Sequence, residues 1–146
     1  EYFHPVAAAV GGILAYAGGI VFLERALDPS KGKLGLPGGF VDPGERAEDA
    51  VARECLEEIG WAPPSLSFLA SFPNVYPYKG VDYRTCDFYF RYLFPEDAPM
   101  PRLAPRDGES ASIRVIPLKE IRAEDLAFDS LKRAIEAYRA LASARR

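Results

Sequence analysis

Three glutamates lie close together near the middle of the chain. Glu54, Glu57 and Glu58 are spaced i, i+3 and i+4, so they share one face if this segment is helical. Like charges at this spacing repel one another and destabilise a helix unless a cation offsets them. The pattern therefore has two interpretations: a fully solvated acidic surface, or a site for a divalent cation, which prefers carboxylate oxygen ligands.

A glycine-rich loop leads directly into these carboxylates. The sequence from 36 to 45 reads LPGGFVDPGE. Glycines permit positive φ and a close approach of the backbone, so carbonyl or amide groups can face a bound ion or a phosphate. Arg53, which lies beside the carboxylates, can pair with Glu45 across the loop and fix its geometry. The loop and the helix are therefore predicted to form one unit.

This unit resembles the Nudix hydrolase family. The Nudix box has the form G-x5-E-x7-R-E-U-x-E-E-x-G-U, where U is an apolar residue. All its defined positions are matched here, by Gly39, Glu45, Arg53, Glu54, Cys55, Glu57, Glu58, Gly60 and Trp61. The resemblance implies an α/β (α+β) fold, the αβα sandwich with a mixed central sheet, in which the box binds Mg²⁺ or Mn²⁺.

The resemblance also implies roles for the residues of the box. Glu54 and Glu58 are the leading metal ligands and Glu57 joins them. A carbonyl of Gly38 or Gly39 completes the metal site. Glu45 and Arg53 then serve as structural residues of the box.

The general base is a glutamate in this family, and two candidates remain open. One is Glu54, the first glutamate after the box arginine. The other lies on a loop downstream of the box, where Glu109 is the best candidate with Asp107 behind it. The alternative for Glu109 is a solvated loop carboxylate with no catalytic role.

The expected reaction is metal-dependent hydrolysis of a pyrophosphate bond in a nucleoside diphosphate linked to another group, by a metal-activated water. The segment from Ser71 to Tyr78 partly resembles the downstream signatures of NADH and ADP-ribose pyrophosphatases. Within it the candidate substrate-binding residues are Phe72, Asn74, Tyr76 and Tyr78, although such aromatics can equally anchor a loop on the sheet. ADP-ribose, NADH or a related dinucleotide is the leading substrate. The alternatives are a hydrolase of noncanonical nucleoside triphosphates and a non-catalytic ligand-binding regulator.

Hydrophobic periodicity predicts the elements that hold this unit. Four-residue spacing of apolar residues predicts a helix over Ala47–Ile59, ended by Gly60. Prolines and tyrosines between 73 and 84 predict a loop, and four prolines between 95 and 108 predict a mobile loop of the length typical of lids. A second amphipathic helix is capped by Asp129 or Ser130. The predicted strands are Val6–Tyr16, Ile20–Leu27, Leu66–Phe72, Thr85–Leu93 and Ser112–Pro117, with short extended pieces at Leu34–Leu36 and Phe40–Val41.

Length and composition are consistent with a single domain over 1–146. The formal net charge of −3 and the lack of a basic cluster favour a small-molecule nucleotide over polymeric nucleic acid as the partner. Two cysteines in predicted regular elements suit a reducing, cytoplasmic environment. The sequence is compatible with a homodimer without fixing the oligomeric state.

The uncharged segment Pro5–Leu23 approaches the length of a membrane helix, but paired glycines interrupt it and two strands explain it better, so no membrane association is expected. Because the chain starts at Glu1 rather than methionine, we expect that a segment upstream was removed or is missing. Some Nudix domains follow a zinc ribbon. Such a ribbon would have to lie in that segment, since this sequence has no Cys-x-x-Cys pair.

Overall fold

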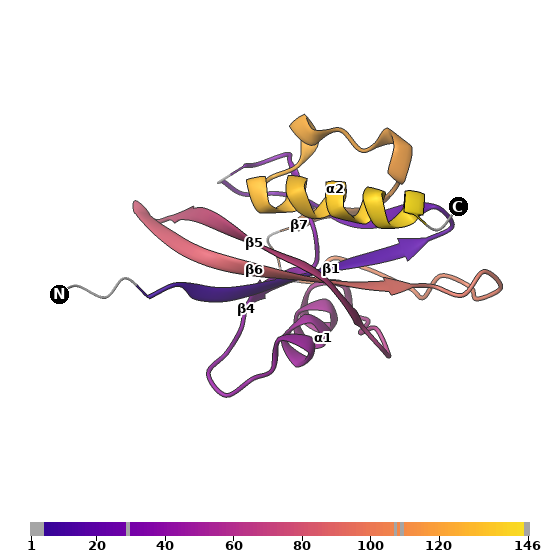
Figure 1. Cartoon of the computed structure of the whole chain (residues 1–146), viewed down its shortest axis with the longest axis horizontal. Helices are drawn as coiled ribbons and strands as arrows, with labels where there is room; N and C mark the ends of the chain where they lie inside the picture. Colours follow the sequence, from indigo (N-terminus) through magenta and orange to yellow (C-terminus); the bar gives the residue numbers. More distant parts are fainter. Residues whose placement is uncertain (1–4, 29, 107, 109, 145–146) are drawn as a thin grey trace.

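The computed structural model describes residues 5–28, 30–106, 108 and 110–144 as strands packed between two long helices (Figure 1). The helices are α1 (Ala47–Ile59) and α2 (Asp129–Ala144), with short 3₁₀ turns η1 (Leu118–Glu120) and η2 (Ala123–Asp125) before α2. The strands are β1 (Ala7–Tyr16), β2 (Gly19–Arg25), β3 (Leu34–Gly35), β4 (Gly38–Phe40), β5 (Ser67–Tyr78), β6 (Val81–Leu93) and β7 (Ser110–Pro117). None of the described helices is long and apolar enough to cross a bilayer.

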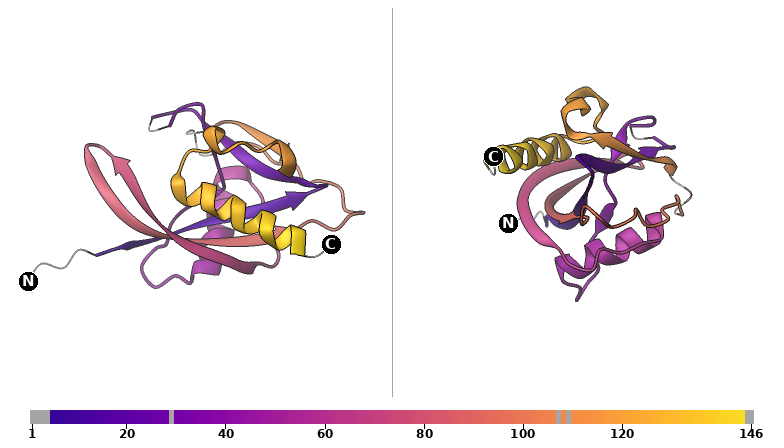
Figure 2. Two further views of the ribbon diagram at one scale, coloured as in Figure 1. Left: turned by 45° about the horizontal axis from the view of Figure 1, so that its top comes forward. Right: turned by 90° about the vertical axis from the view of Figure 1, so that its right-hand side faces the viewer.

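Strand β1 is the central strand of a mixed sheet. It runs parallel to β6, from the pair Ala7–Thr85 to the pair Ala15–Leu93. On its other side it pairs antiparallel with β4 at one end and with β2 at the other. The path through the sheet is β3-β2-β1-β6-β5, with β7 added to β2 (Figure 2). The expected mixed sheet is therefore confirmed, and β1 lies between the glycine-rich β4 and β6.

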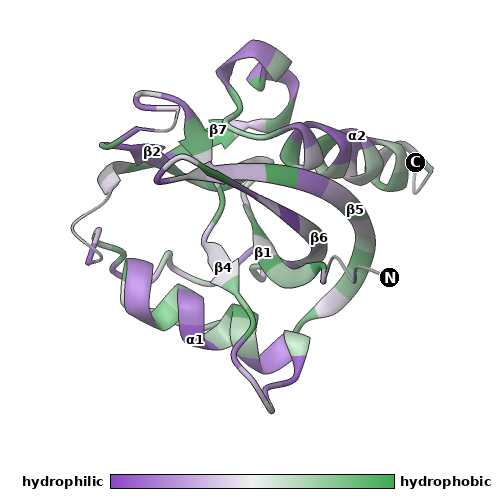
Figure 3. Ribbon diagram, turned by 90° about the vertical axis from the view of Figure 1, so that its left-hand side faces the viewer, coloured by the Kyte–Doolittle hydropathy of each residue, from purple (hydrophilic) through white to green (hydrophobic). Residues whose placement is uncertain are grey.

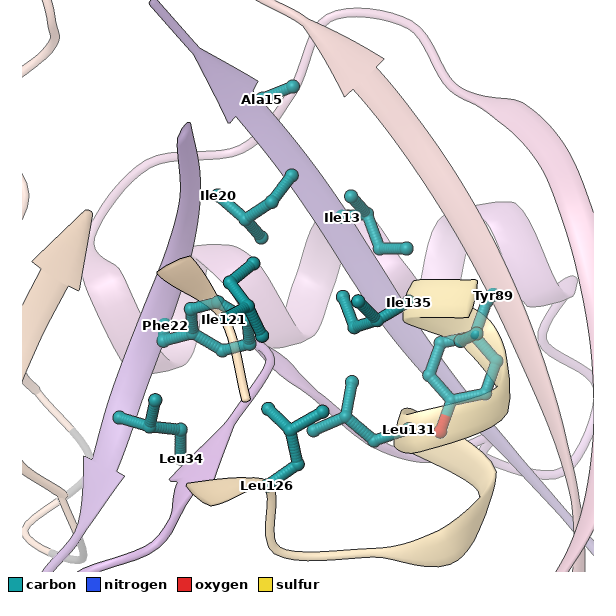
Figure 4. Close-up of a cluster of buried hydrophobic side chains, with 11 residues drawn as sticks. Ile13, Ala15, Ile20, Phe22, Leu34, Tyr89, Ile121, Leu126, Leu131 and Ile135 are labelled. Atoms are coloured by element: carbon teal, nitrogen blue, oxygen red, sulfur yellow. The ribbon is translucent and has the colours of Figure 1, made fainter. Parts of the chain in front are cut away.

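Each face of the sheet carries its own hydrophobic core, because successive side chains of a strand point to opposite faces. Ile13 and Ala15 of β1 pack with Leu131 and Ile135 of α2, and Tyr89 joins them (Figure 4). Leu14 on the opposite face packs in the second core with residues of α1, chiefly Val51, Cys55 and Ile59. Helices α1 and α2 therefore cover opposite faces, which confirms the expected αβα sandwich (Figure 3).

The box helix forms where the sequence predicts it. Its apolar stripe, Ala50, Val51, Cys55 and Ile59, is buried against the sheet. Gly60 ends it with φ 77°, in the left-handed region that glycine adopts at low cost, and its N–H donates to the Leu56 carbonyl. No side chain caps the start of α1, where the acidic residues Glu48 and Asp49 instead complement the helix dipole.

The prediction of a loop over 73–84 is wrong. Strand β5 continues to Tyr78 and β6 starts at Val81, and the two strands pair throughout this stretch. Lys79 and Gly80 both have positive φ, which gives the two-residue turn typical of tight hairpins. Pro73 and Pro77 are tolerated because β5 is the last strand of the sheet, where a missing N–H disrupts no inner pairing. The hairpin extends the sheet beyond its central strand.

The segment 95–106 is irregular, as predicted, but it is anchored to the box helix. The N–H groups of Ala104 and Arg106 donate to the carbonyls of Ile59 and Glu58, which are among the last carbonyls of α1. Leu103 packs against the core beneath α1. The described part of this loop therefore stabilises the end of the helix that carries the acidic residues.

Candidate functional site

The approach of strand β4 to its neighbours depends on two glycines. A Cβ atom at Gly38 would lie 2.0 Å from the carbonyl oxygen of Val10 in β1. A Cβ atom at Gly39 would lie 2.7 Å from Oε1 of Glu54 in α1. Real Cβ atoms do not come this close to other heavy atoms. The two glycines therefore allow the box helix to bring a carboxylate against the backbone of β4.

Arg53 holds the loop between β4 and α1 in place. Its Nε and one terminal nitrogen donate to the two oxygens of Glu45, at 2.8 and 2.9 Å, and the same terminal nitrogen donates to the Phe40 carbonyl at 3.1 Å. The Glu45 carboxylate also accepts the N–H of Asp42. The hydrogen bond from Arg53, followed by that from Asp42, lowers the pKa of Glu45 to about 2. The pairing expected across the loop is thus present, and it is bidentate.

Two of the three predicted acidic ligands face a cavity. Glu54 and Glu58 both line it, beside Gly38 and Gly39. Oε2 of Glu58 accepts the N–H of Gly38 at 3.1 Å, and Glu54 accepts a hydrogen bond from Arg53 at 3.0 Å. Burial raises the pKa of Glu54, although its contact with Arg53 opposes that rise. Negative charge is therefore concentrated and partly desolvated at this end of the cavity.

Glu57 does not turn towards the cavity. Its side chain is 56% exposed and pairs with Arg53 at 3.3 Å. Within the described ranges, no group of three or more His, Cys, Asp or Glu residues is close enough to hold a metal ion together. A divalent cation nevertheless fits the donor set of Glu54 and Glu58, since it would offset the charge of two adjacent, partly buried carboxylates. Glu57 would have to leave Arg53 to join them.

The cavity has a volume of about 610 Å³ and extends away from the carboxylates along the sheet. This volume lies within the range of about 300 to 1,000 Å³ typical of small-molecule sites. Its floor is formed by the start of β1 and by Thr85, Asp87 and Tyr89 of β6. These three alternate along the strand and so share the face covered by α2.

An aromatic wall with one cation closes the far side of the cavity. Tyr76 of β5 packs against Phe128, with ring centroids 5.4 Å apart, and against Phe40, at 6.4 Å. Arg25 of β2 lies over the Phe128 ring, 5.3 Å from its centroid, and donates to the hydroxyl of Tyr76. Tyr83 of β6 also lines the cavity. Such a wall presents flat apolar surfaces on which a nucleobase can stack.

The predicted substrate-binding residues divide into three groups. Asn74 and Tyr76 line the cavity. Phe72 instead packs against the core beneath α2 and is not among the residues that line the cavity. The side chain of Tyr78 lies outside the described part of the structure, as do Glu109 and Asp107, the predicted base and the residue behind it.

Among the cavity residues that the sequence did not indicate are Arg25, Tyr83, Asp87 and Phe128. Phe128 immediately precedes the second amphipathic helix, where an apolar residue ordinarily packs in the core. Asp87 lies inside the predicted strand Thr85–Leu93, on the same face as Tyr89. The signal that could have found it is an acidic residue in the interior of a strand that runs beside the central strand, where a buried carboxylate requires partners.

A model of the NUDIX domain family matches residues 4–138 of the chain. Among curated proteins, the ADP-ribose pyrophosphatase of Methanocaldococcus jannaschii is 45% identical over 73 residues, which are 50% of this chain and 43% of that protein. The NAD-capped RNA hydrolase NudC of Haemophilus influenzae is 31% identical over 94 residues, covering 56% of this chain and 36% of that protein. The matches thus span less than half the length of these relatives.

Solved structures share the fold. The NUDIX domain of Shewanella oneidensis NrtR, solved with ADP ribose, superposes with a TM-score of 0.75 at 23% identity and covers 94% of this chain and 89% of its own. The bifunctional NMN adenylyltransferase/ADP ribose pyrophosphatase of Francisella tularensis, solved with AMP and a manganese ion, has a TM-score of 0.72 at 20% identity, covering 96% of this chain and 43% of its own. At these identities the likeness extends to the fold alone.

Proposed function

The chain belongs to the Nudix family, and from that premise we propose that it hydrolyses the pyrophosphate bond of a nucleoside diphosphate linked to another group. ADP-ribose or a related dinucleotide is the proposed substrate. The observation that carries this proposal is the two-ended cavity. One end holds the carboxylates Glu54 and Glu58 beside Gly38 and Gly39, and the other end is walled by aromatic rings.

The acidic end explains why the activity should depend on a cation. A diphosphate is repelled by adjacent carboxylates, so it can bind there only when a positive charge lies between them. Glu54 and Glu58 would hold Mg²⁺ or Mn²⁺, together with a carbonyl of Gly38 or Gly39, and Glu57 would join them after leaving Arg53. A bound ion would supply the positive charge that a diphosphate needs beside these carboxylates, and it would make a nearby water more acidic.

The protein itself supplies position and proton transfer. Arg53 and Glu45 fix the loop, so that the Gly38–Gly39 backbone and the Glu54 carboxylate keep their relative positions. Glu54, or alternatively Glu109, accepts the proton of the attacking water. The reaction adds water across one P–O bond of the anhydride and leaves two phosphate monoesters. From ADP-ribose these would be AMP and ribose 5-phosphate.

The aromatic end supports a substrate that contains a nucleoside. Tyr76 and Phe128 offer surfaces for a base, and the Arg25 guanidinium adds a positive charge near the same rings. The names of two relatives point the same way, since one is an ADP-ribose pyrophosphatase and one structural relative was solved with ADP ribose.

The test is product chromatography on ADP-ribose, NADH, FAD, diadenosine polyphosphates and nucleoside triphosphates, each with Mg²⁺, with Mn²⁺ and with chelator. We expect turnover of ADP-ribose or a dinucleotide that chelator abolishes. Preferred turnover of triphosphates would transfer the assignment to the hydrolysis of noncanonical nucleotides. Stabilisation of the protein by these ligands without any turnover would make it a binding module and contradict the proposed activity.

A further inference from the structure

A buried carboxylate lies on the floor of the cavity, away from the box. The side chain of Asp87 belongs to a residue that is only 8% exposed, yet it lines the cavity between Thr85 and Tyr89. Asp87 pairs with Ala9 of β1, and Ala9 pairs with Phe40 of β4. Because neighbouring strands are about 4.8 Å apart, the backbone of Asp87 lies roughly 10 Å from that of β4. The carboxylate is therefore separate from Glu54 and Glu58.

The orientation of this carboxylate is fixed from both sides. Oδ1 accepts the hydroxyl of Thr85 at 2.6 Å, and Oδ2 accepts the hydroxyl of Ser130, from α2, at 2.5 Å. The Ser130 hydroxyl has one hydrogen, which it gives to Asp87, so the Tyr89 hydroxyl 2.7 Å away must donate to Ser130. The result is a directed chain of hydrogen bonds that ends on Asp87.

These contacts leave acceptor capacity on Asp87. An ionised carboxylate can accept about four hydrogen bonds, and the hydroxyls of Thr85 and Ser130 use two of them. In the part of the chain that the structure describes, no Lys or Arg forms an ion pair with Asp87. A buried charge without a cation is stabilised only by hydrogen-bond donors. The open side of Asp87 faces the cavity, where a ligand can supply them.

The charge of Asp87 also determines which part of a substrate can bind next to this carboxylate. A phosphate next to this carboxylate would be repelled, since no cationic partner offsets the charge. A neutral group that carries O–H or N–H donors is favoured. Tyr76 and Phe128, which offer stacking surfaces for a base, line the same cavity. The nucleoside part of the substrate has both properties, because it combines a flat ring with hydroxyl and amino donors.

We infer that Asp87 is a specificity-determining residue that accepts a hydrogen bond from an O–H or N–H donor on the nucleoside part of the substrate. The inference rests on the proposed function of this cavity. Ser130 and Tyr89 are positioning residues, which hold the carboxylate in place through α2 and the sheet. Two donors share the required chemistry: a ribose hydroxyl and the exocyclic amino group of the base.

Matched pairs of substrates test this assignment. The reference is ADP-ribose. The hydroxyl arm uses its 2′-deoxy- and 3′-deoxyadenosine forms, and the amino arm uses its hypoxanthine form. For the wild-type protein we expect kcat/KM to fall roughly 10- to 100-fold in one arm, the value for one hydrogen bond to a charged acceptor. Asp87→Asn should lower kcat/KM for ADP-ribose by a similar factor. It should leave kcat/KM for the analogue of that arm unchanged, so that the preference for ADP-ribose over the analogue disappears.

Two control variants separate recognition from structure. Ser130→Ala removes the hydroxyl that contacts both Asp87 and Tyr89 but keeps the carboxylate, so it should lower the melting temperature and weaken the preference without abolishing it. Asp82→Asn makes the same chemical change at an exposed position of the same strand, outside the cavity, and should alter neither. If Asp87→Asn reduces kcat/KM equally for all four compounds, or if the wild-type protein shows no preference in either arm, the inference is wrong.

The same ligands separate this inference from the proposed function. If the wild-type protein hydrolyses none of them, the ratios are measured as Kd by titration calorimetry with Mg²⁺, and the proposed activity fails if the dinucleotides of the substrate panel are not hydrolysed either. A preference in Kd that Asp87→Asn removes would still support donor recognition by Asp87. Equal Kd values for ADP-ribose and all its analogues, or no binding at all, would overturn it.

Discussion

Because Gly38 and Gly39 have no side chains, the Glu54 carboxylate can lie close to the backbone of β4. Any Cβ atom at either position would collide with a carbonyl oxygen or with the Glu54 carboxylate. The proximity has an electrostatic consequence, because Glu54 is partly desolvated and its pKa is raised by burial. Even with Arg53 3.0 Å away, a carboxylate in this environment destabilises the protein at neutral pH, and a bound cation would offset that cost.

We therefore expect Glu54→Gln or Glu58→Gln to lower kcat/KM by at least roughly 100-fold, since each removes a charge that holds the cation. In chelator, Glu54→Gln should not lower the melting temperature, because it removes a charge that is poorly solvated. Steady-state kinetics with Mg²⁺ and thermal unfolding in chelator test the two effects.

The matched control is Glu48→Gln in the first turn of the same helix, where the carboxylate is 46% exposed and lies 3.9 Å from Arg46. Activity should be unaffected by that change. Near-normal rates in both Glu54→Gln and Glu58→Gln, with unchanged metal dependence, would remove these residues from the site.

At the scale of elements, Arg53 holds the loop between β4 and α1, since it pairs with Glu45 at 2.8 Å and with Asp42 at 3.5 Å. The hydrogen bond from Arg53 has the largest effect on the pKa of Glu45, and the hydrogen bond from the Asp42 amide has the next largest. Together they hold this pKa at about 2, compared with an ordinary 4.5. Since the pKa is lower in the folded state, the stabilisation is fully present above pH 4.5 and is lost as the pH falls towards 2.

We expect Glu45→Gln to lower the melting temperature in chelator by an amount that is constant above pH 4.5 and shrinks as the pH falls from 4.5 towards 2. Thermal unfolding across this range, on the wild type and the variant, measures the difference. A difference that grows in acid would contradict the depressed pKa of Glu45.

The sequence predicted elements best where one local signal dominates. Spacing predicted both ends of α1, and the pairing of Arg53 with Glu45 followed from the residue types. The β5–β6 hairpin was missed because Pro73 and Pro77 normally argue against a strand, and only the position of β5 at the edge of the sheet removes that objection. Topology of this kind is not encoded in a local window.

The far end of the cavity was less predictable for the same reason. Phe128 and Tyr76 meet only because α2 packs across β5 and β6. Asp87 reads locally as the polar face of a strand, but the sheet is covered on both faces, so that polar face is buried and lines the cavity. Residues that the fold brings together from distant segments were therefore the ones that sequence reasoning overlooked.

At the scale of the whole molecule, both cores depend on the same central strand. Leu14 belongs to the core beneath α1, and its neighbours Ile13 and Ala15 belong to the core beneath α2. Loss of either core therefore removes support from the strand that the other core needs. The two layers should unfold as one cooperative unit.

We expect Leu14→Ala and Ile135→Ala, one in each core, to lower the free energy of unfolding by about 2 to 5 kcal/mol each. Urea unfolding should be followed by the fluorescence of Trp61, which stacks on Phe94 beneath α1, and by far-UV circular dichroism. The two signals should coincide in both variants. Separate transitions in Ile135→Ala would show that the α2 layer unfolds independently.

Strand β5 ends one side of the sheet and exposes Phe68 and Val75, so its outer backbone groups could recruit another β-strand. Pro73 and Pro77 lie four residues apart, so both imide nitrogens point to the same side of the strand, and pairing with β6 places that side outwards. Neither nitrogen carries a hydrogen to donate. The register shift between Phe68 and Ala70 interrupts the remaining edge. The prolines that obscured this strand in the sequence therefore protect the molecule against edge-to-edge aggregation.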